Sequence, residues 1–128
     1  MATTLRASVF ALLQADTTLR SLLSKAADPY GIYFLHPPKT PVFPVVTFAE
    51  LAASGDFPRV GSFQTTAWHG DRDAILRQIY ATLHNATITA TDFGHVKILF
   101  DWMVPDLLDA TWHVYFRQSR WLYQAIKL

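Results

Sequence analysis

The clearest pattern of apolar and polar positions runs from residue 59 to residue 85. Over residues 59–69, aromatic, β-branched and small residues occupy every second position, which predicts a β-strand. Asp71 then stands where a carboxylate accepts hydrogen bonds from the free amides of a first helical turn. Residues 71–85 are predicted to be helical, because apolar residues recur there at steps of three and four. These residues are Ile75, Leu76, Ile79, Tyr80 and Leu83. Strand and helix are each apolar on one side, so each is expected to cover the other.

The rest of the chain completes an α+β plan. Thr4 is the predicted cap of a leading helix, and Asp16 is predicted to cap a second helical segment. The N-terminal region is therefore expected to form one kinked helix or two short helices. Further strands are predicted at residues 45–49, 95–104 and 110–118, with candidate shorter strands at 30–35 and 87–91. The strand 95–104 is apolar on one face and half apolar on the other. The predicted fold is a single domain over residues 1–128. It has a sheet of about four strands, antiparallel or mixed, with an N-terminal helix (or two) and one crossover helix packed on it.

Three segments are candidates for contact with a neighbouring subunit, and for the first two the alternative is packing within the subunit. Five prolines impose an extended path on residues 28–44, which is either a surface connector or a subunit contact. The loop 51–58 carries Leu51 and Phe57, which either fold back onto the core or dock into a neighbour. Residues 119–128 are aromatic and apolar, and we interpret them as an interaction tail.

The composition indicates a folded chain with more apolar residues than a lone subunit needs. Hydrophobic residues make up 51% of the 128 residues and charged residues 16%, which argues against disorder and favours a surface covered by another chain. The net charge of +1 provides no strong field for nucleic acid or an acidic membrane. Cysteine is absent, which excludes disulfides, thiolate zinc sites and cysteine nucleophiles. The sequence shows no secretory signal and no membrane-spanning segment.

Residues that could carry chemistry form no recognised motif. His69 with Asp71, and Asp92 with His95, lack a specific metal-ligand spacing, and Asp71 is better explained as a helix cap. No serine lies in the glycine-flanked elbow of a nucleophile, and no glycine-rich phosphate loop is present. We therefore expect a protein that is not an enzyme, with no catalytic residue, metal or cofactor.

The C-terminal region offers a weak case for nucleic-acid binding. Arg117, Arg120 and Lys127 interleave with Trp121 and Tyr123, a mixture that in denser patches stacks bases and binds phosphates. Three cations spread over about eleven residues are sparse for such a patch. A solvated strand end beside an aromatic contact surface explains the same residues, so we expect no sequence-specific nucleic-acid binding.

The order of the segments resembles that of a known protein family. A leading helix over 5–23 is followed by Gly31-Ile32-Tyr33, a proline-rich run, Pro44-Val45-Val46-Thr47-Phe48, a strand at 63–68, a helix at 74–83 and a closing strand at 111–117. This order resembles the tail-completion family of long-tailed bacteriophages, the head–tail joining or tail-terminator proteins. The resemblance covers nearly the whole domain and rests on residue types, none of them diagnostic alone. The aromatic residues 121–128 and the length of the proline segment depart from the family pattern.

The resemblance implies a structural virion protein that performs no bond chemistry and is assembled in the host cytoplasm. Such proteins form a ring, usually a hexamer, at the head-proximal end of the tail tube, where they stop tube growth and receive the head connector. The expected partners are further copies of this chain, the tail tube protein and the head connector protein. Genome DNA is expected to pass through the ring, and no membrane is involved. The alternatives are a connector stopper or minor tail protein, or a small-ligand-binding or enzymatic α+β domain.

A closed ring needs a heterologous contact, in which one surface meets a different surface of the next copy. Exposed aromatic residues are our candidates for that contact. They are Tyr33 and Phe34 in the proline segment, Phe57 in the loop, and Trp121 and Tyr123 in the C-terminal segment. Replacing Trp121 and Tyr123 with alanine is expected to weaken oligomerisation without unfolding the subunit.

Overall fold

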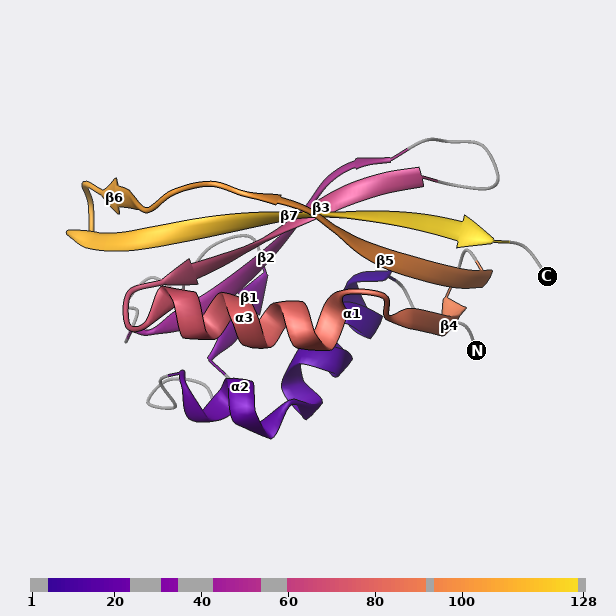
Figure 1. Cartoon of the computed structure of the whole chain (residues 1–128), viewed down its shortest axis with the longest axis horizontal. Coiled ribbons are helices and arrows are strands. Elements are labelled where there is room, and N and C mark those ends of the chain that lie inside the picture. Colours follow the sequence, from indigo (N-terminus) through magenta and orange to yellow (C-terminus); the bar gives the residue numbers. More distant parts are fainter. Residues whose placement is uncertain (1–4, 24–30, 35–42, 54–59, 92–93, 127–128) are drawn as a thin grey trace.

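The computed structural model describes residues 5–23, 31–34, 43–53, 60–91 and 94–126 (Figure 1). In chain order these form α1 (Leu5–Ala15), α2 (Thr17–Ser21), β1 (Ile32–Phe34), β2 (Val45–Ala53), β3 (Val60–Trp68), α3 (Arg72–Leu83), β4 (Thr87–Thr91), β5 (Gly94–Met103), β6 (Leu107–Asp109) and β7 (Val114–Ile126). The α+β class is confirmed, and the N-terminal region forms two helices. Thr4 and Phe57 lie outside the described residues.

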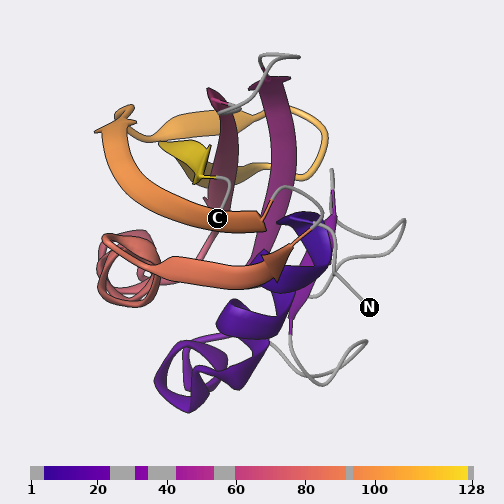
Figure 2. The same cartoon turned by 90° about the vertical axis from the view of Figure 1, so that its right-hand side faces the viewer.

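The described strands form one sheet of seven members, more than the four or so expected from the sequence. Their order is β1-β2-β3-β7-β5-β4, and β6 pairs with the first residues of β7. β1 and β2 are parallel and the other pairs are antiparallel, so the sheet is mixed. β3 and β5 are both antiparallel to β7 and therefore run parallel to each other, which makes α3 part of a crossover connection. Figure 2, seen along the long axis, shows the sheet curling from β4 round to β2.

The strand that turns into a helix is confirmed where the sequence pattern predicts it. Asp71 caps α3, because its carboxylate accepts a hydrogen bond of 3.1 Å from the backbone amide of Ala74. The apolar stripe of α3 is buried against the sheet, except that Tyr80 is exposed. Burial of each such side chain contributes roughly 1.5–3 kcal/mol before conformational entropy is subtracted. The sheet and α3 therefore stabilise each other.

Asp16 caps α2 and also joins α2 to α3. Its carboxylate accepts hydrogen bonds from the Leu19 amide at 3.0 Å, from the Gln78 side chain at 2.8 Å and from the Thr82 hydroxyl. Burial opposes ionisation of this carboxyl, but the hydrogen bonds from Thr82, Gln78 and Leu19 outweigh it and lower the pKa of Asp16. One acidic side chain thus ties the start of α2 to two residues of α3, which lie 62 and 66 positions further along the chain.

The core lies between the sheet and the helices α1 and α3. Four aromatic side chains form its centre: Phe48 lies 5.0 Å from Phe63, which stacks on Trp121 at 6.3 Å, and Phe100 meets Trp121 edge-on at 5.3 Å (ring centroids). The indole nitrogen of Trp121 donates a hydrogen bond of 3.1 Å to the hydroxyl of Thr65, so its polar atom is satisfied inside the core.

The C-terminal segment differs from the sequence interpretation. Residues 119–126 are the second half of β7, the longest strand, and not a separate tail. β3 pairs with β7 on one side and β5 on the other, which places Trp121 opposite both Phe63 and Phe100. β2 also continues beyond its predicted end and includes Leu51, which the sequence places in a loop.

Candidate assembly surface

A hairpin projects from one end of the sheet and carries most of the exposed large apolar side chains. We call residues 102–116 the arm; they comprise the end of β5, β6, a turn and the beginning of β7 (Figure 1). Nine large hydrophobic side chains are exposed among the described residues, and five of them belong to the arm. These five are Trp102, Met103, Leu107, Leu108 and Tyr115. More than half of the exposed large apolar side chains in the described ranges therefore lie on one projection.

Local backbone pairing gives the arm a defined shape. Leu107 lies opposite Phe116 and Asp109 opposite Val114 in the β6–β7 ladder. The carboxylate of Asp109 accepts hydrogen bonds of 2.9 Å from the backbone amides of Thr111 and Trp112, which closes the turn. The exposed leucines are thus presented by a hydrogen-bonded hairpin.

An ionic clamp holds the base of the arm against α3. Asp106 accepts two hydrogen bonds from Arg72, from Nε and from Nη2, each 2.9 Å long. Arg117 of β7 donates a third through Nε, also at 2.9 Å, and reaches Asp73 of α3 at 3.7 Å. The hydrogen bonds from Arg72 first, and those from Arg117 next, lower the pKa of Asp106 to about 2 despite partial burial. The carboxylate is therefore ionised at neutral pH, and the clamp is charged on both sides.

Aromatic side chains fix the opposite side of the arm to the sheet. Trp68, at the end of β3, lies 4.8 Å from Phe116 and 5.7 Å from Trp112 between ring centroids. Phe43 completes the cluster at 5.8 Å from Trp112, and Trp68 donates a hydrogen bond of 2.9 Å to Thr47. The arm is consequently held from both faces, which keeps its exposed side chains in place.

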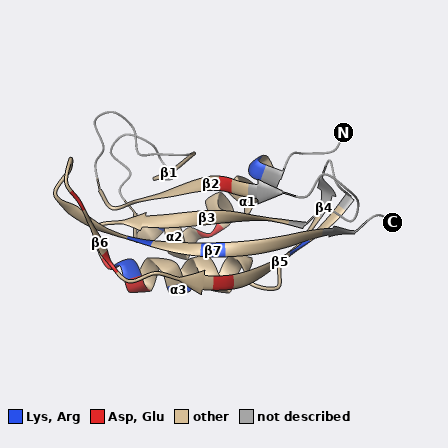
Figure 3. Cartoon of the chain, turned by 90° about the horizontal axis from the view of Figure 1, so that it is seen from above, with Lys and Arg blue, Asp and Glu red and all other residues tan. Residues whose placement is uncertain are grey.

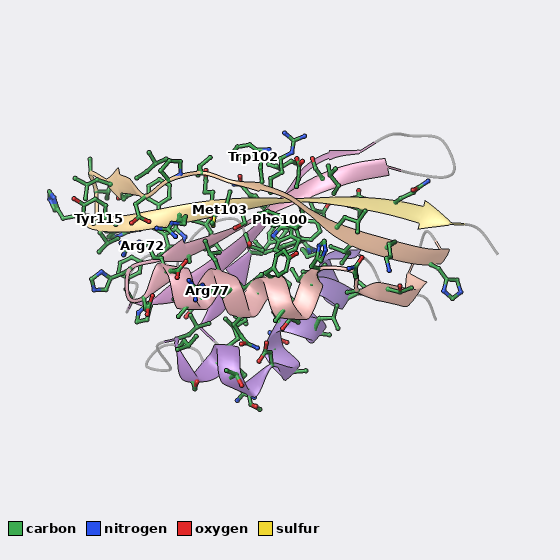
Figure 4. All side chains as sticks on the ribbon, in the orientation of Figure 1. Arg72, Arg77, Phe100, Trp102, Met103 and Tyr115 are labelled. Atoms are coloured by element: carbon green, nitrogen blue, oxygen red, sulfur yellow. The ribbon has the colours of Figure 1, made fainter. Side chains whose placement is uncertain are left out.

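A bulge in β5 decides which way its last side chains point. Phe100 pairs with Trp121 and Trp102 with Arg120, so Asp101 is an extra residue in the strand. Beyond the bulge Trp102 lies on the face away from α3, and Met103 lies on the face toward α3 (Figure 4). The two faces predicted for strand 95–104 assumed strict alternation, which would put Phe100 and Trp102 on one face; the bulge makes that prediction wrong at this point.

A shallow groove of about 130 Å³ lies between α3 and the sheet, beside the base of the arm. Tyr80, Phe100 and Met103 give it an apolar lining, and Asp73 and Arg77 lie at its charged side. Asp73 and Arg77 pair with each other at 2.9 Å. The groove thus extends the apolar surface of the arm toward α3.

The aromatic residues predicted to form the subunit contact are distributed differently. Trp121 and Tyr123 are 0% and 6% exposed, so the prediction that they offer a free surface is wrong: both belong to the core of the subunit. Tyr33 and Phe34 are half-buried in β1, and Phe34 packs against Phe48 at 5.8 Å. Phe57 lies outside the described residues. A subunit contact through Tyr33, Phe34 and Phe57 stays a prediction.

Two features of the sequence indicate the arm, although the sequence analysis did not identify it. The half-apolar second face of strand 95–104 indicates a sheet region with apolar side chains on both sides. Leu107 and Leu108, which the sequence interpretation assigned to a connection, form β6 and are exposed. Two adjacent leucines in a short connection are the residues that mark this surface.

The described part of the chain contains no cluster of three or more histidine, cysteine or acidic residues able to hold a metal ion. None of the helices in that part combines the length and apolar character needed to cross a membrane. The described residues form a surface suited to binding, with exposed apolar side chains around a charged clamp.

Comparison of the sequence with protein-family profiles and with curated protein sequences finds no match. Among solved structures, one described as the virion of a native gene transfer agent (GTA) particle contains a chain with a similar fold. The TM-score is 0.75 at 18% sequence identity, and the alignment covers 94% of this chain and 93% of that chain. At this identity the likeness shows a shared fold over almost the whole length of both chains.

Proposed function

We propose that this chain is a structural protein of a phage-like virion that terminates the tail tube and joins it to the head connector. It acts as a ring of identical copies, a hexamer by its resemblance to the tail-completion family. Its place is the head-proximal end of the tail. The role requires binding surfaces and no bond chemistry, so we assign no catalytic residue, metal or cofactor.

The observation that carries the proposal is the fold shared with a chain of the gene transfer agent virion. The similarity extends over 94% of this chain, so it is not the recurrence of a common motif such as one hairpin. Because a fold by itself does not dictate function, the order of segments supplies the second support. That order resembles the tail-completion family, and both lines of argument point to a virion component.

The arm supports an assembly role on physical grounds. Exposed apolar side chains on a rigid projection are costly to a protein that stays alone in water, and they favour association with another surface. The clamp around Asp106 and the aromatic cluster around Trp68 restrict the motion of the arm, so little entropy is lost when it binds.

Electron microscopy of the purified protein, alone and mixed with tail tubes from the same particle, tests the proposal. We expect ring-shaped particles and a density capping one end of each tube, with sedimentation giving a mass several times that of the chain. Tubes incubated without the protein are the control for uncapped ends. Protein that remains monomeric and leaves both tube ends bare would overturn the proposal.

Labelling of intact virions separates this role from the nearest alternative. A gold-labelled antibody against the chain should mark the junction between head and tail. Labelling inside the head connector would indicate a connector stopper, and labelling along or at the distal end of the tail a minor tail protein. Either of these outcomes replaces tail termination while retaining a structural role in the virion.

A further inference from the structure

We propose that the tip of the arm docks into the groove between α1 and β4 of a second copy of this chain. The tip comprises Leu107, Leu108 and Tyr115, and the contact repeats from copy to copy. This inference rests on the proposed ring and names the two surfaces that join its subunits.

The acceptor is an apolar groove, and none of its described lining residues is charged. It measures about 330 Å³ and lies between one side of α1 and the beginning of β4. The lining residues are Ser8, Ala11, Leu12, Ala15, Thr87 and Ile88. The two alanines leave the groove open along α1, and its floor is provided by Leu12 and the buried Ile88. The described lining accepts leucine side chains and contains no charged group.

Donor and acceptor lie at opposite ends of the molecule. β6 is at one end of the long axis, whereas β4 and the start of α1 lie toward the other end (Figure 1). The view from above gives the same arrangement (Figure 3). Two different surfaces at opposite ends produce a heterologous, head-to-tail contact, which closes into a ring when the rotation between copies allows it.

The apolar area of the tip is a large part of what a stable contact needs. Leu107, Leu108 and Tyr115 are 48%, 57% and 51% exposed. With an accessible area of about 200 Å² for each complete side chain, the tip presents roughly 300 Å² of apolar surface. A standard interface covers about 800 Å² on each partner, of which about 60% is apolar. The tip therefore supplies more than half of the apolar area that one side of such an interface contains.

The charge at the tip of the arm disfavours a contact between two tips. Asp109 forms no ion pair with any described residue, and its carboxylate accepts hydrogen bonds from the turn amides of Thr111 and Trp112. Two tips brought together would place two such carboxylates near each other, and like charges across an interface are costly. A head-to-tail contact with the groove avoids this repulsion.

Disulfide trapping tests the contact directly, because the chain contains no cysteine. The double variant Leu108→Cys with Ala11→Cys should give a ladder of covalent oligomers under mild oxidation of assembled rings. The control is Leu51→Cys with Ala11→Cys, because Leu51 is 49% exposed and belongs to neither surface. The control should give at most dimers. Rings that form and cap tubes but yield no ladder with the first pair would overturn the inference and leave the proposed function standing.

A second experiment uses substitutions that block either surface. Leu108→Asp on the arm and Ala11→Trp in the groove should each raise the concentration needed for half-assembly at least tenfold. Leu51→Asp should leave that concentration unchanged, and circular dichroism should be the same for all three variants. Unchanged assembly of both blocking variants would overturn the inference. A wild-type chain that forms no ring, in solution or on tubes, would overturn both the inference and the proposed function.

Discussion

Asp106 at the base of the arm is bound by Arg72 at the start of α3, with two hydrogen bonds of 2.9 Å between residues 34 positions apart. The same guanidinium lies 5.5 Å from the centroid of the Tyr115 ring. Arg72 thus contacts a charged and an aromatic residue on the two sides of the hairpin. Arg72 therefore links both sides of the hairpin to the start of α3.

Asp106→Asn should destabilise the protein by about 1–2 kcal/mol, because it removes the charge that three hydrogen bonds from arginine share. The cost stays this small because the Asp106 side chain is partly exposed to solvent, which screens its charge. Urea unfolding followed by tryptophan fluorescence measures the change.

Arg77→Gln is the matched control for that substitution. Arg77 forms an exposed ion pair with Asp73 on α3 and takes no part in the clamp, so its loss should cost less than about 0.5 kcal/mol. Equal losses of stability for the two variants would show that the clamp contributes no more than an ordinary surface pair.

The clamp should also give the protein a defined dependence on pH. The pKa of Asp106 is lowered to about 2 in the folded chain, from 3.8 as its ordinary value. A carboxyl with a depressed folded pKa stabilises the fold above the unfolded pKa and loses this contribution as pH falls through the folded value. The stability difference between wild type and Asp106→Asn should therefore be constant above about pH 5 and shrink between about pH 4 and pH 2.

The pH series compares urea midpoints of the two proteins at constant ionic strength. Asp16 also has a lowered pKa, but it is present in both proteins and cancels in the difference. A difference that stays the same down to pH 2 would contradict the assignment of the pKa shift to the clamp.

The two helix caps should differ in energetic importance. Asp71→Ala removes a hydrogen bond to the Ala74 amide and should cost about 1 kcal/mol. Asp16→Ala removes a cap and also the bonds to Gln78 and Thr82, so it should cost about 2 kcal/mol or more. Chemical unfolding of both variants tests the order, and equal costs would mean that the bridge from α2 to α3 adds nothing.

Local patterns were sufficient to predict the strand and helix around Asp71. The alternation before that residue and the stripe after it are set by side chains close in sequence. The caps at Asp16 and Asp71 were predictable for the same reason, because each acts on an amide three residues ahead. Such features depend on neighbours along the chain, which a sequence displays directly.

Features that depend on distant partners were not predictable in the same way. Trp121 looks like part of an exposed tail until it is known that β3 and β5 both pair with residues 119–126. The bulge at Asp101 depends on the register with β7, and no local residue pattern predicts it. The candidate surface was missed because its residues face outward only after these long-range pairings are made.

Trp121→Ala should destabilise or unfold the subunit, in contrast to the outcome expected from the sequence. The side chain is fully buried, stacks on Phe63 and donates a hydrogen bond to Thr65, so its truncation leaves a large cavity and should cost about 3–5 kcal/mol.

The neighbouring Leu122→Ala is the control. The Leu122 side chain is 36% exposed, so its truncation should cost less than about 1 kcal/mol. Trp121→Phe should lie between them, since it keeps the ring but loses the bond to Thr65. Thermal unfolding of the three variants, with sedimentation of each at a temperature where it is folded, separates loss of folding from loss of assembly. A folded Trp121→Ala variant with unchanged stability and weakened assembly would restore the interpretation of this residue as a subunit contact.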